Sequence, residues 1–447
     1  MIGLVTLLAS IRLFSFIDHY AVNLLFWDQW DYYRPIFQPT SFWELFSWQH
    51  GPHRQGLGEL ITYVLAWSSS WNTRLDAFAI GIVLLLSALT LLAVKRSVSR
   101  NWDFSDIIIP LTVLSLVQYE TLVNTPNLSH SALPLLLVSL YAWSWQISNQ
   151  LFRVAAILII NFLGIFTGFG FFLGPITIFF FLLACFHAVS GKEMRQAVFA
   201  VIALLVVMLS MYIYFIGYHF QPAIECFSIT LEEIRKYPTF IGLMLLNFLN
   251  IGGPTAGIAK QMVALLPFSG IVWVLLQSSI HLLRTGYARQ NRTMQVAFIL
   301  AGFSFLFCLN TAVGRTCLGL VASQASRYLT ITSLSFCGIY IYLLTWKSSR
   351  WRVLAIYGLL AVILLAYISP LKRSDWAVIN NFHDGKVRWK ECYLSYEDVA
   401  LCNQQAGFAI YPVIDPQIQQ GLDFFKARHL NLYLDQPSLS SEDPSSE

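Results

Sequence analysis

The stretch 196–217 reads QAVFAVIALLVVMLSMYIYFIG and holds twenty-two residues without a charged side chain. A helix of about 20 apolar residues is long enough to cross the hydrocarbon core of a bilayer. Apolar runs of comparable length recur along most of the chain. This pattern predicts an all-α polytopic membrane protein.

The overall composition excludes the other classes of protein. Of the 447 residues, 12% are charged and 56% are hydrophobic, whereas a soluble protein carries about 25% charged residues. The aromatic content of 15% and the seven scattered cysteines argue against a disordered chain, a collagen, a coiled coil and a disulfide-dense scaffold. The 28 basic and 24 acidic residues are too evenly matched for a nucleic-acid surface. We therefore expect membrane lipid around the chain and no nucleic acid partner.

Hydropathy predicts about eleven membrane-spanning helices along the chain. They are expected at 2–18, 75–94, 106–120, 131–147, 153–168, 170–188, 196–217, 262–283, 295–313, 327–346 and 353–369.

Basic residues near the helix ends predict the orientation, because Lys and Arg are retained on the cytoplasmic side. Such residues fall on alternate loops, at 95–100, 153, 192–195, 284–292 and 347–352. The opposite loops are then outside, at 19–74, 121–130, 218–261, 314–326 and the tail from 370. The apolar stretch 56–71 would break this alternation if it spanned, so it is expected to form a juxtamembrane helix. The charged residues of 218–261 are read mainly as a solvated face.

The chain is expected to have two regions. Residues 1–369 form the membrane domain, with a large outer loop over 19–74, and residues 370–447 form a small extracytoplasmic region with a disordered end. Cys392 and Cys402 lie in this second region, on the side of the membrane where disulfides persist. Two free thiols are the alternative, but we predict that the pair is bonded.

The first outer loop carries the most informative motif, FWDQWDYYRPIF at 26–37. Asp28 and Asp31 lie three positions apart and share one face if the segment is helical. His50, His53 and Arg54 follow in the same loop. An interfacial belt explains the aromatic residues. An acid pair with possible metal ligands and a phosphate partner is more typical of a reactive site.

Further candidates lie at the outer ends of other predicted helices. Arg315 and Arg327 can each bind a phosphate through a bidentate guanidinium, or can simply snorkel to the interface. Tyr328 can hydrogen-bond a sugar or phosphate, or belong to the aromatic belt. Glu120 can line a sugar pocket, pair with an arginine, or be solvated at a helix end.

This arrangement resembles the GT-C superfamily of integral-membrane glycosyltransferases. Shared features are an acidic motif after the first helix, a His motif at the end of the loop, a juxtamembrane helix and a span that begins near Arg74. The protein O-mannosyltransferases and the bacterial aminoarabinose transferase are most similar in pattern. The motifs DQWD, QYE and SRY resemble a bacterial branch of the superfamily. By this resemblance Asp28 takes the place of the catalytic acid, and His50 and His53 take the place of the His motif.

The resemblance implies an inverting hexosyltransferase-type enzyme that moves a sugar from a polyprenyl-phosphate donor to a hydroxyl of a glycan, lipid or protein acceptor. Asp28 or Asp31 would be the base, and partial desolvation would raise its basicity. Arg54, Arg315 or Arg327 would hold the phosphate. The active site and C-terminus would face outward from a bacterial inner membrane.

Two departures from the family pattern bear on a cofactor. Gln29 stands where the family has Glu, and Pro52 precedes His53 instead of following it. They leave open whether a divalent cation, Mg²⁺ or Mn²⁺, binds at Asp28, Asp31 and His53.

A transporter or flippase for a lipid-linked glycan is the alternative function, since it also needs outer cations and aromatic residues. Alternating access usually places the binding groups near the bilayer midplane on paired repeats. The ionisable residues here gather at the outer ends of the helices, and no paired repeat is visible. This placement favours the enzyme.

Overall fold

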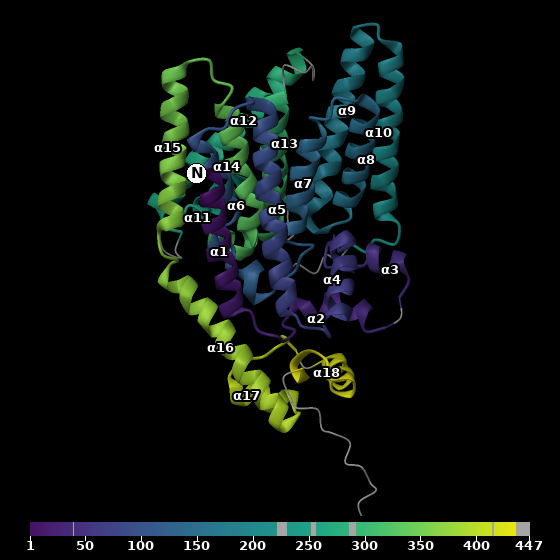
Figure 1. Ribbon diagram of the computed structural model, residues 1–447, viewed down its shortest axis with the longest axis vertical. Helices are drawn as coiled ribbons and strands as arrows, with labels where there is room; N and C mark the ends of the chain where they lie inside the picture. The colour runs from purple at the N-terminus through teal and green to yellow at the C-terminus, as the bar shows by residue number, and fades with distance from the viewer. Residues whose placement is uncertain (39, 221–229, 252–255, 286–291, 414, 435–447) are drawn as a thin grey trace, which may run out of the picture.

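The computed structural model describes residues 1–38, 40–220, 230–251, 256–285, 292–413 and 415–434, and most of them are helical (Figure 1). The α-helices are α1 (Ile2–Tyr20), α2 (Asp28–Tyr33), α3 (Phe42–Ser47), α4 (Gly56–Ser68), α5 (Arg74–Ser99), α6 (Ile108–Val113), α7 (Ala132–Ser144), α8 (Gln150–Ile165), α9 (Leu173–Ser190), α10 (Met194–Phe215), α11 (Leu231–Phe248), α12 (Ile258–Thr285), α13 (Arg292–Arg315), α14 (Leu329–Leu343), α15 (Ser349–Ile368), α16 (Arg373–Tyr396), α17 (Val399–Ala406) and α18 (Pro416–Arg428). The strands β1 (Gln49–His50) and β2 (His53–Arg54) pair as an antiparallel hairpin.

Short helical turns connect these elements. They are η1 (Arg34–Ile36), η2 (Phe104–Ile107), η3 (Leu116–Gln118), the π-helical η4 (Glu120–Asn124), η5 (Gly168–Phe172), η7 (Thr316–Leu318), η8 (Leu320–Gln324), η9 (Ser326–Tyr328) and η10 (Asn431–Tyr433).

Seven helical segments of the described chain are long and apolar enough to cross a membrane. They are Ile2–Tyr20, Arg74–Ser99, Gly168–Ser190, Met194–Phe215, Ile258–Thr285, Arg292–Leu318 and Ser349–Ile368. Shorter apolar helical segments lie at Phe104–Gln118, Ala132–Ser144 and Gln150–Ile165. Each of the eleven predicted ranges contains a helix, but several are short for a span, so the count of about eleven is not confirmed.

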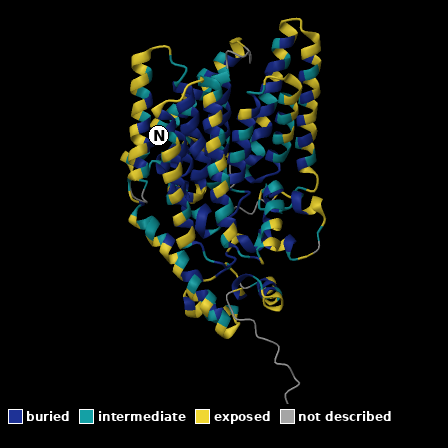
Figure 2. Cartoon of the chain, viewed as in Figure 1, coloured by how far each residue is buried: buried dark blue, intermediate teal, exposed yellow. Residues whose placement is uncertain are grey.

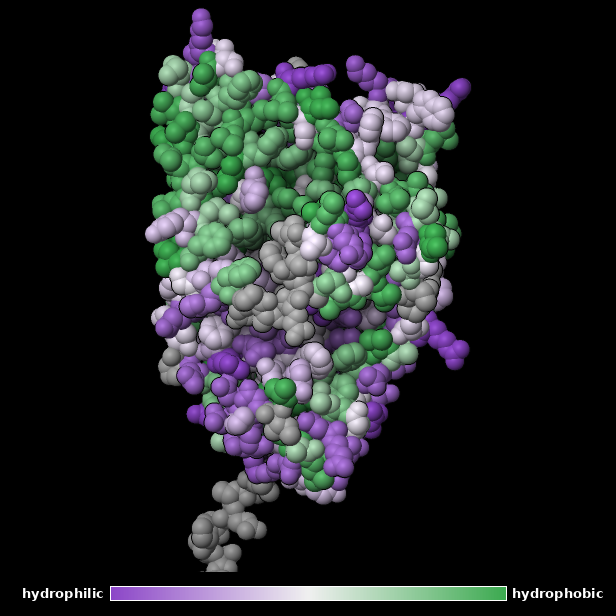
Figure 3. Space-filling view, turned by 180° about the vertical axis from the view of Figure 1, so that it is seen from behind, coloured by the Kyte–Doolittle hydropathy of each residue, from purple (hydrophilic) through white to green (hydrophobic). Residues whose placement is uncertain are grey.

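The distribution of apolar side chains is that of a helical membrane protein. The central helices are buried, whereas peripheral α10 and α15 expose many residues (Figure 2). The exposed residues of α15 include Leu354, Leu365 and Ile368. Hydrophobic side chains cover much of the upper part of the bundle, and hydrophilic ones gather at the lower end (Figure 3). Exposed apolar surface on this scale is satisfied by lipid.

The described part of the C-terminal region packs against the first loop. Buried residues of the first loop, such as Phe26 and Trp30, share one hydrophobic cluster with Trp389 and Phe425 of α16 and α18. Lys386 of α16 is 2% exposed, and its ammonium donates to the carbonyls of Val123 and Asn124 at the end of η4. The loop 19–74 and the tail therefore form one unit at the lower end of the bundle (Figure 1).

A disulfide joins α16 to α17 through Cys392 and Cys402, the pair that we predicted from the sequence. Cys402 is fully buried in the same cluster as the first loop. The bond thus fixes the short α17 against the long α16.

Helix α11 was missed in the range 218–261, which was expected to be mainly a solvated loop. Its first turns do carry charges, with Lys236 bonded to Glu232 and Glu233 at 3.0 Å. From Phe240 to Phe248, however, every residue is buried. The charged first half lowers the average hydropathy of the segment, and so hides the apolar second half. The Glu225 position lies outside the described residues.

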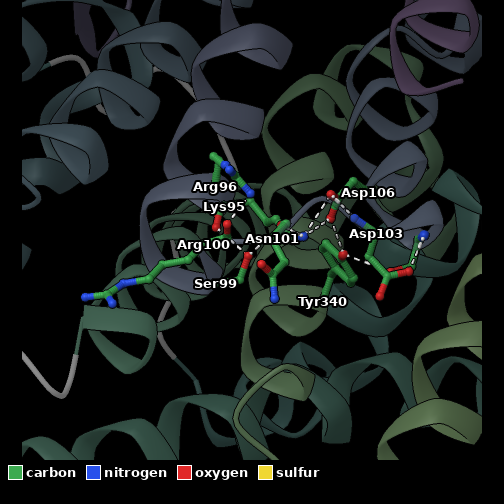
Figure 4. Close-up of polar contacts among 9 residues, drawn as sticks. Lys95, Arg96, Ser99, Arg100, Asn101, Asp103, Asp106 and Tyr340 are labelled. Atoms are coloured by element: carbon green, nitrogen blue, oxygen red, sulfur yellow. Dashed lines mark hydrogen bonds and ion pairs between the residues drawn. The ribbon is translucent and has the colours of Figure 1, made fainter.

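A buried ion pair lies at the end of the bundle opposite the loop 19–74, and Figure 4 shows its polar contacts. Lys95 Nζ lies 2.6 Å from Asp106 Oδ1, and the two side chains are 2% and 0% exposed. The Tyr340 hydroxyl donates to the same carboxylate at 2.6 Å, which connects α5, η2 and α14. Lys95 is therefore a buried structural residue, which its place in the basic cluster at 95–100 did not reveal.

Replacing Lys95 with Met should strongly destabilise the protein, because Asp106 would be left buried without a cation. Removing one partner of a buried pair typically costs about 3–5 kcal/mol. Denaturant unfolding of the purified protein in detergent measures the change. Arg96→Met removes an exposed cation from the next position and should cost less than about 1 kcal/mol. Equal stability of the two variants would contradict a structural role for the pair.

Candidate functional site

A cavity of about 440 Å³ lies at the lower end of the bundle, where the loop between α1 and α5 meets the ends of several membrane helices. Its volume is within the range of about 300–1,000 Å³ that is typical of ligand sites. It is lined by Asp28, Tyr32, His50, Gly51, Pro52, His53, Thr121, Thr125, Asn127, His130, Phe169, Asn310, Thr311, Gly314, Arg315, Arg327 and Tyr328.

Asp28 begins α2. Its side chain is 57% exposed and lines the cavity. The C-terminal region holds the backbone next to Asp28, because the N–H of the preceding residue, Trp27, donates to the Ile410 carbonyl at 2.8 Å. His50 Nε2 lies 3.9 Å from Asp28 Oδ2. The His50 ring is the main cause that holds the pKa of Asp28 below its usual value, and it outweighs the opposing effect of partial burial; Arg327 and Arg315 make smaller contributions in the same direction as His50.

This lowered pKa corrects the expectation that desolvation would make Asp28 more basic. The carboxylate is instead kept ionised at neutral pH. It is therefore always ready to accept a proton, although it binds that proton weakly.

The β1–β2 hairpin presents two histidines to the cavity. His50 and His53 face each other across the two strands, and Gly51 makes the turn with a φ of +55° that favours glycine. The His53 ring packs against Phe169 at 4.4 Å and against His130 at 5.2 Å between ring centroids. The HGPH sequence thus acts through its turn geometry, which brings both imidazoles to one cavity.

Burial keeps His53 and His130 uncharged. It lowers the pKa of His53 to about 3, with help from the neighbouring His50 and Arg315. It also lowers the pKa of His130 well below its usual value, assisted by His53 and His50. These two rings can therefore donate or accept hydrogen bonds, and do not supply positive charge for a phosphate.

The depressed pKa of His53 predicts a loss of stability in acid. Between the ordinary histidine pKa of about 6.5 and about 3, the unfolded chain binds a proton that folded His53 does not, so stability falls as pH falls. His53→Gln should lose less melting temperature than the wild type between pH 7 and pH 5. His219→Gln, at an exposed position, should behave as wild type. An equal loss in all three proteins would show that His53 does not titrate in this way.

The cations of the cavity come from the C-terminal part of the bundle. Arg315 ends α13, and Arg327 and Tyr328 lie in η9. The Arg327 guanidinium lies 5.6 Å from the centroid of the Tyr328 ring. Glu120 does not line the cavity, but its carboxylate accepts a hydrogen bond from the backbone N–H of Arg327 at 2.8 Å. Glu120 thus holds η9 in place.

Besides Glu120, two predicted site residues lie outside the cavity. The Asp31 carboxylate accepts hydrogen bonds from the Tyr411 hydroxyl at 3.1 Å and pairs with Arg34 at 3.3 Å. Arg54 is 4% exposed, and its guanidinium donates to backbone carbonyls of Ser47, Tyr214 and Ile216. The structure therefore brings Asp28, His50, His53, Arg315, Arg327 and Tyr328 together and leaves Glu120, Asp31 and Arg54 outside.

Several cavity residues were not among the predicted site residues. Asn127 and His130 come from the loop 121–130, where a run of polar residues between two apolar segments was the available signal. Phe169 comes from η5, in a stretch that reads as membrane-spanning. Gly168 has a φ of +51°, and a side chain there would collide with the Ser129 carbonyl. This close approach brings η5 against the loop.

The proposed ligands for a divalent cation do not converge. Asp31 is bonded to Tyr411 away from the cavity, so only Asp28 and His53 of the expected set line it. Within the described ranges, no group of three or more His, Cys, Asp or Glu side chains is arranged to hold a metal. Asp28, Asp31 and His53 therefore do not fit a shared metal site.

Comparison of the chain with protein-family models, with curated proteins and with solved structures gave no match.

Proposed function

We propose that this protein is a GT-C-type glycosyltransferase that moves a sugar from a polyprenyl-phosphate donor to an acceptor hydroxyl. One observation carries the proposal. An ionised acid, Asp28, shares a cavity at the bundle end with two arginines, Arg315 and Arg327, that are almost three hundred residues away in sequence. An acid beside a pair of cations suits the transfer of a group from a phosphate.

In the proposed reaction, the acceptor oxygen attacks the anomeric carbon of the donor sugar from the face opposite the phosphate. The bond between this carbon and the phosphate oxygen breaks, and the lipid phosphate leaves with the electron pair, so the configuration inverts. Asp28 takes the proton of the acceptor hydroxyl as that oxygen becomes positive. Arg315 and Arg327 stabilise the charge on the leaving phosphate.

The histidines of the cavity have a supporting role in this proposal. His50 keeps Asp28 ionised, and His53 and His130 offer hydrogen bonds to sugar hydroxyls without adding charge. Because the phosphate leaves as a stable anion, the reaction needs no strong general acid. This requirement fits a cavity in which the buried imidazoles stay neutral.

Asp28→Asn should abolish most of the turnover, while donor binding survives. The amide keeps the shape of the carboxylate but cannot accept a proton at neutral pH, and a missing base typically costs a factor of about 100 to 10,000. The measurement is sugar transfer from a polyprenyl-phosphate donor by purified protein. The acceptor is found by comparing the cell's glycans with and without the gene.

Asp31→Asn is the matched control, because it removes a carboxylate from the same short helix but outside the cavity. Its transfer rate should stay near that of the wild type. Arg315→Ala and Arg327→Ala should weaken donor binding as well as rate, since the phosphate is present in both the ground state and the transition state. If Asp28→Asn transfers sugar at the normal rate, Asp28 is not the base and the proposed mechanism is wrong. If the wild type transfers no sugar, the flippase becomes the better hypothesis.

We also propose that the end of the bundle with the Asp28 cavity faces outward from a bacterial inner membrane. About eleven helical segments would span this membrane. The α9–α10 and α14–α15 connections lie at the end of the bundle opposite α2–α4 and α16–α18 (Figure 1). These two connections hold predicted cytoplasmic basic clusters.

An impermeant thiol reagent on intact cells tests this orientation. Ala409→Cys, at the cavity end, should be labelled before lysis, and Ser190→Cys, at the other end, only after lysis; both positions are exposed in the structure. Peptide mass analysis identifies the labelled site. The reverse pattern would place the cavity in the cytoplasm.

A further inference from the structure

A second and larger cavity lies between the first outer loop, the end of α10 and helix α18 of the C-terminal region. Its volume is about 850 Å³. We call it the α18 cleft. Its walls include Arg34, Phe37, Trp48, Gln417, Gln420 and Phe424.

The β1–β2 hairpin separates the α18 cleft from the Asp28 cavity. Gln49 and Arg54, which pair across the hairpin, line the α18 cleft, while His50 and His53 line the Asp28 cavity. Successive side chains of a strand point to opposite faces, so one two-stranded hairpin forms a wall of both spaces. A ligand held in the α18 cleft would therefore lie one hairpin away from Asp28.

The cations of the α18 cleft are already neutralised or occupied. The Arg34 guanidinium lies 3.3 Å from the Asp31 carboxylate and 3.8 Å from that of Asp415. The Arg54 guanidinium uses donors from all three of its nitrogens on backbone carbonyls. A phosphate or other anion would have to displace these partners. The α18 cleft is thus better suited to an uncharged ligand.

The groups that remain suit a polyhydroxylated ligand. Phe37 and Phe424 offer aromatic surface, with ring centroids 5.3 Å apart. The exposed amides of Gln417 and Gln420 can each donate and accept hydrogen bonds. Trp48 Nε1 is a buried donor without a partner in the described chain. A sugar ring presents hydroxyls that both donate and accept, and a C–H face that packs on an aromatic ring.

We propose that the α18 cleft binds the acceptor of the reaction, and that this acceptor is a neutral oligosaccharide. Only the role of this oligosaccharide as an acceptor rests on the proposed function, because saccharide binding can be measured without any transfer. A peptide chain is the competing ligand. It would need paired backbone donors and acceptors along its length, whereas the α18 cleft is walled by side-chain amides and aromatic rings.

Direct binding tests the proposal. The purified full-length protein in detergent is titrated with a panel of neutral hexose oligosaccharides, and separately with a panel of uncharged peptides, by saturation-transfer difference NMR. The wild type should bind at least one oligosaccharide. The double variant Gln417→Ala/Gln420→Ala should bind that oligosaccharide about tenfold or more weakly, because two hydrogen-bonding amides are lost.

Gln404→Ala is the matched control, since it removes an exposed amide from α17 outside the α18 cleft. It should bind as the wild type does. Asp28→Asn should also keep the binding, because Asp28 lines the other cavity. Retained binding together with a normal rate of transfer in Asp28→Asn would overturn the proposed mechanism but not the saccharide site.

Three outcomes would overturn the saccharide site itself. They are no binding of any oligosaccharide by the wild type, binding of peptides only, and equal weakening in Gln404→Ala and the double variant. If transfer is established, the double variant should raise the acceptor KM and leave donor binding unchanged.

Discussion

The guanidinium of Arg54 fixes the part of the structure on which both cavities depend. Its Nε donates to the Tyr214 carbonyl at 2.9 Å and its Nη2 to the Ile216 carbonyl at 2.6 Å, at the C-terminal end of α10. A cation is favourable there, because the carbonyls at a helix C-terminus carry partial negative charge. The group also lies 5.5 Å from the centroid of the Tyr214 ring. Arg54 therefore fastens the hairpin to a membrane helix through backbone carbonyls, with no carboxylate partner among the residues that the structure describes.

The unit formed by the first loop and the C-terminal region positions the acid. Trp27 has a φ of 49°, which is unusual for a residue with a side chain, and its N–H is held by Ile410. Lys386 is buried against the end of η4, and burial lowers its pKa to about 7. The tail thus contacts the backbone next to Asp28 and also the turn next to Glu120. Because the same unit walls the α18 cleft, it links the proposed catalytic acid to the proposed acceptor site.

Sequence reasoning located most helices, because an apolar run of sufficient length has few other ways to bury its surface. It missed α11, where charges such as Glu232 and Lys236 come before the buried half. It placed Lys95 in a basic cluster near a helix end, but it did not predict that Asp106 and Tyr340 enclose this residue. Charge on a single residue does not reveal its partner when that partner lies on another helix. Within the site, Asp28, the two histidines, Arg315, Arg327 and Tyr328 were all named from local motifs, whereas Asn127 and Phe169 were not.

The sequence alone determined that lipid surrounds this protein, since 12% charged residues cannot cover a surface in water. It also determined the polar residues that lie at the ends of apolar runs. Only the tertiary structure shows that Asp28 lines the cavity and Asp31 does not, because both follow the same helix in the same motif. The choice comes from contacts made by distant residues: Tyr411 binds one carboxylate, and His50 approaches the other. It likewise decided that Arg54 is structural, since the carbonyls that occupy its donors belong to Ser47 and to a helix end more than one hundred and fifty residues away.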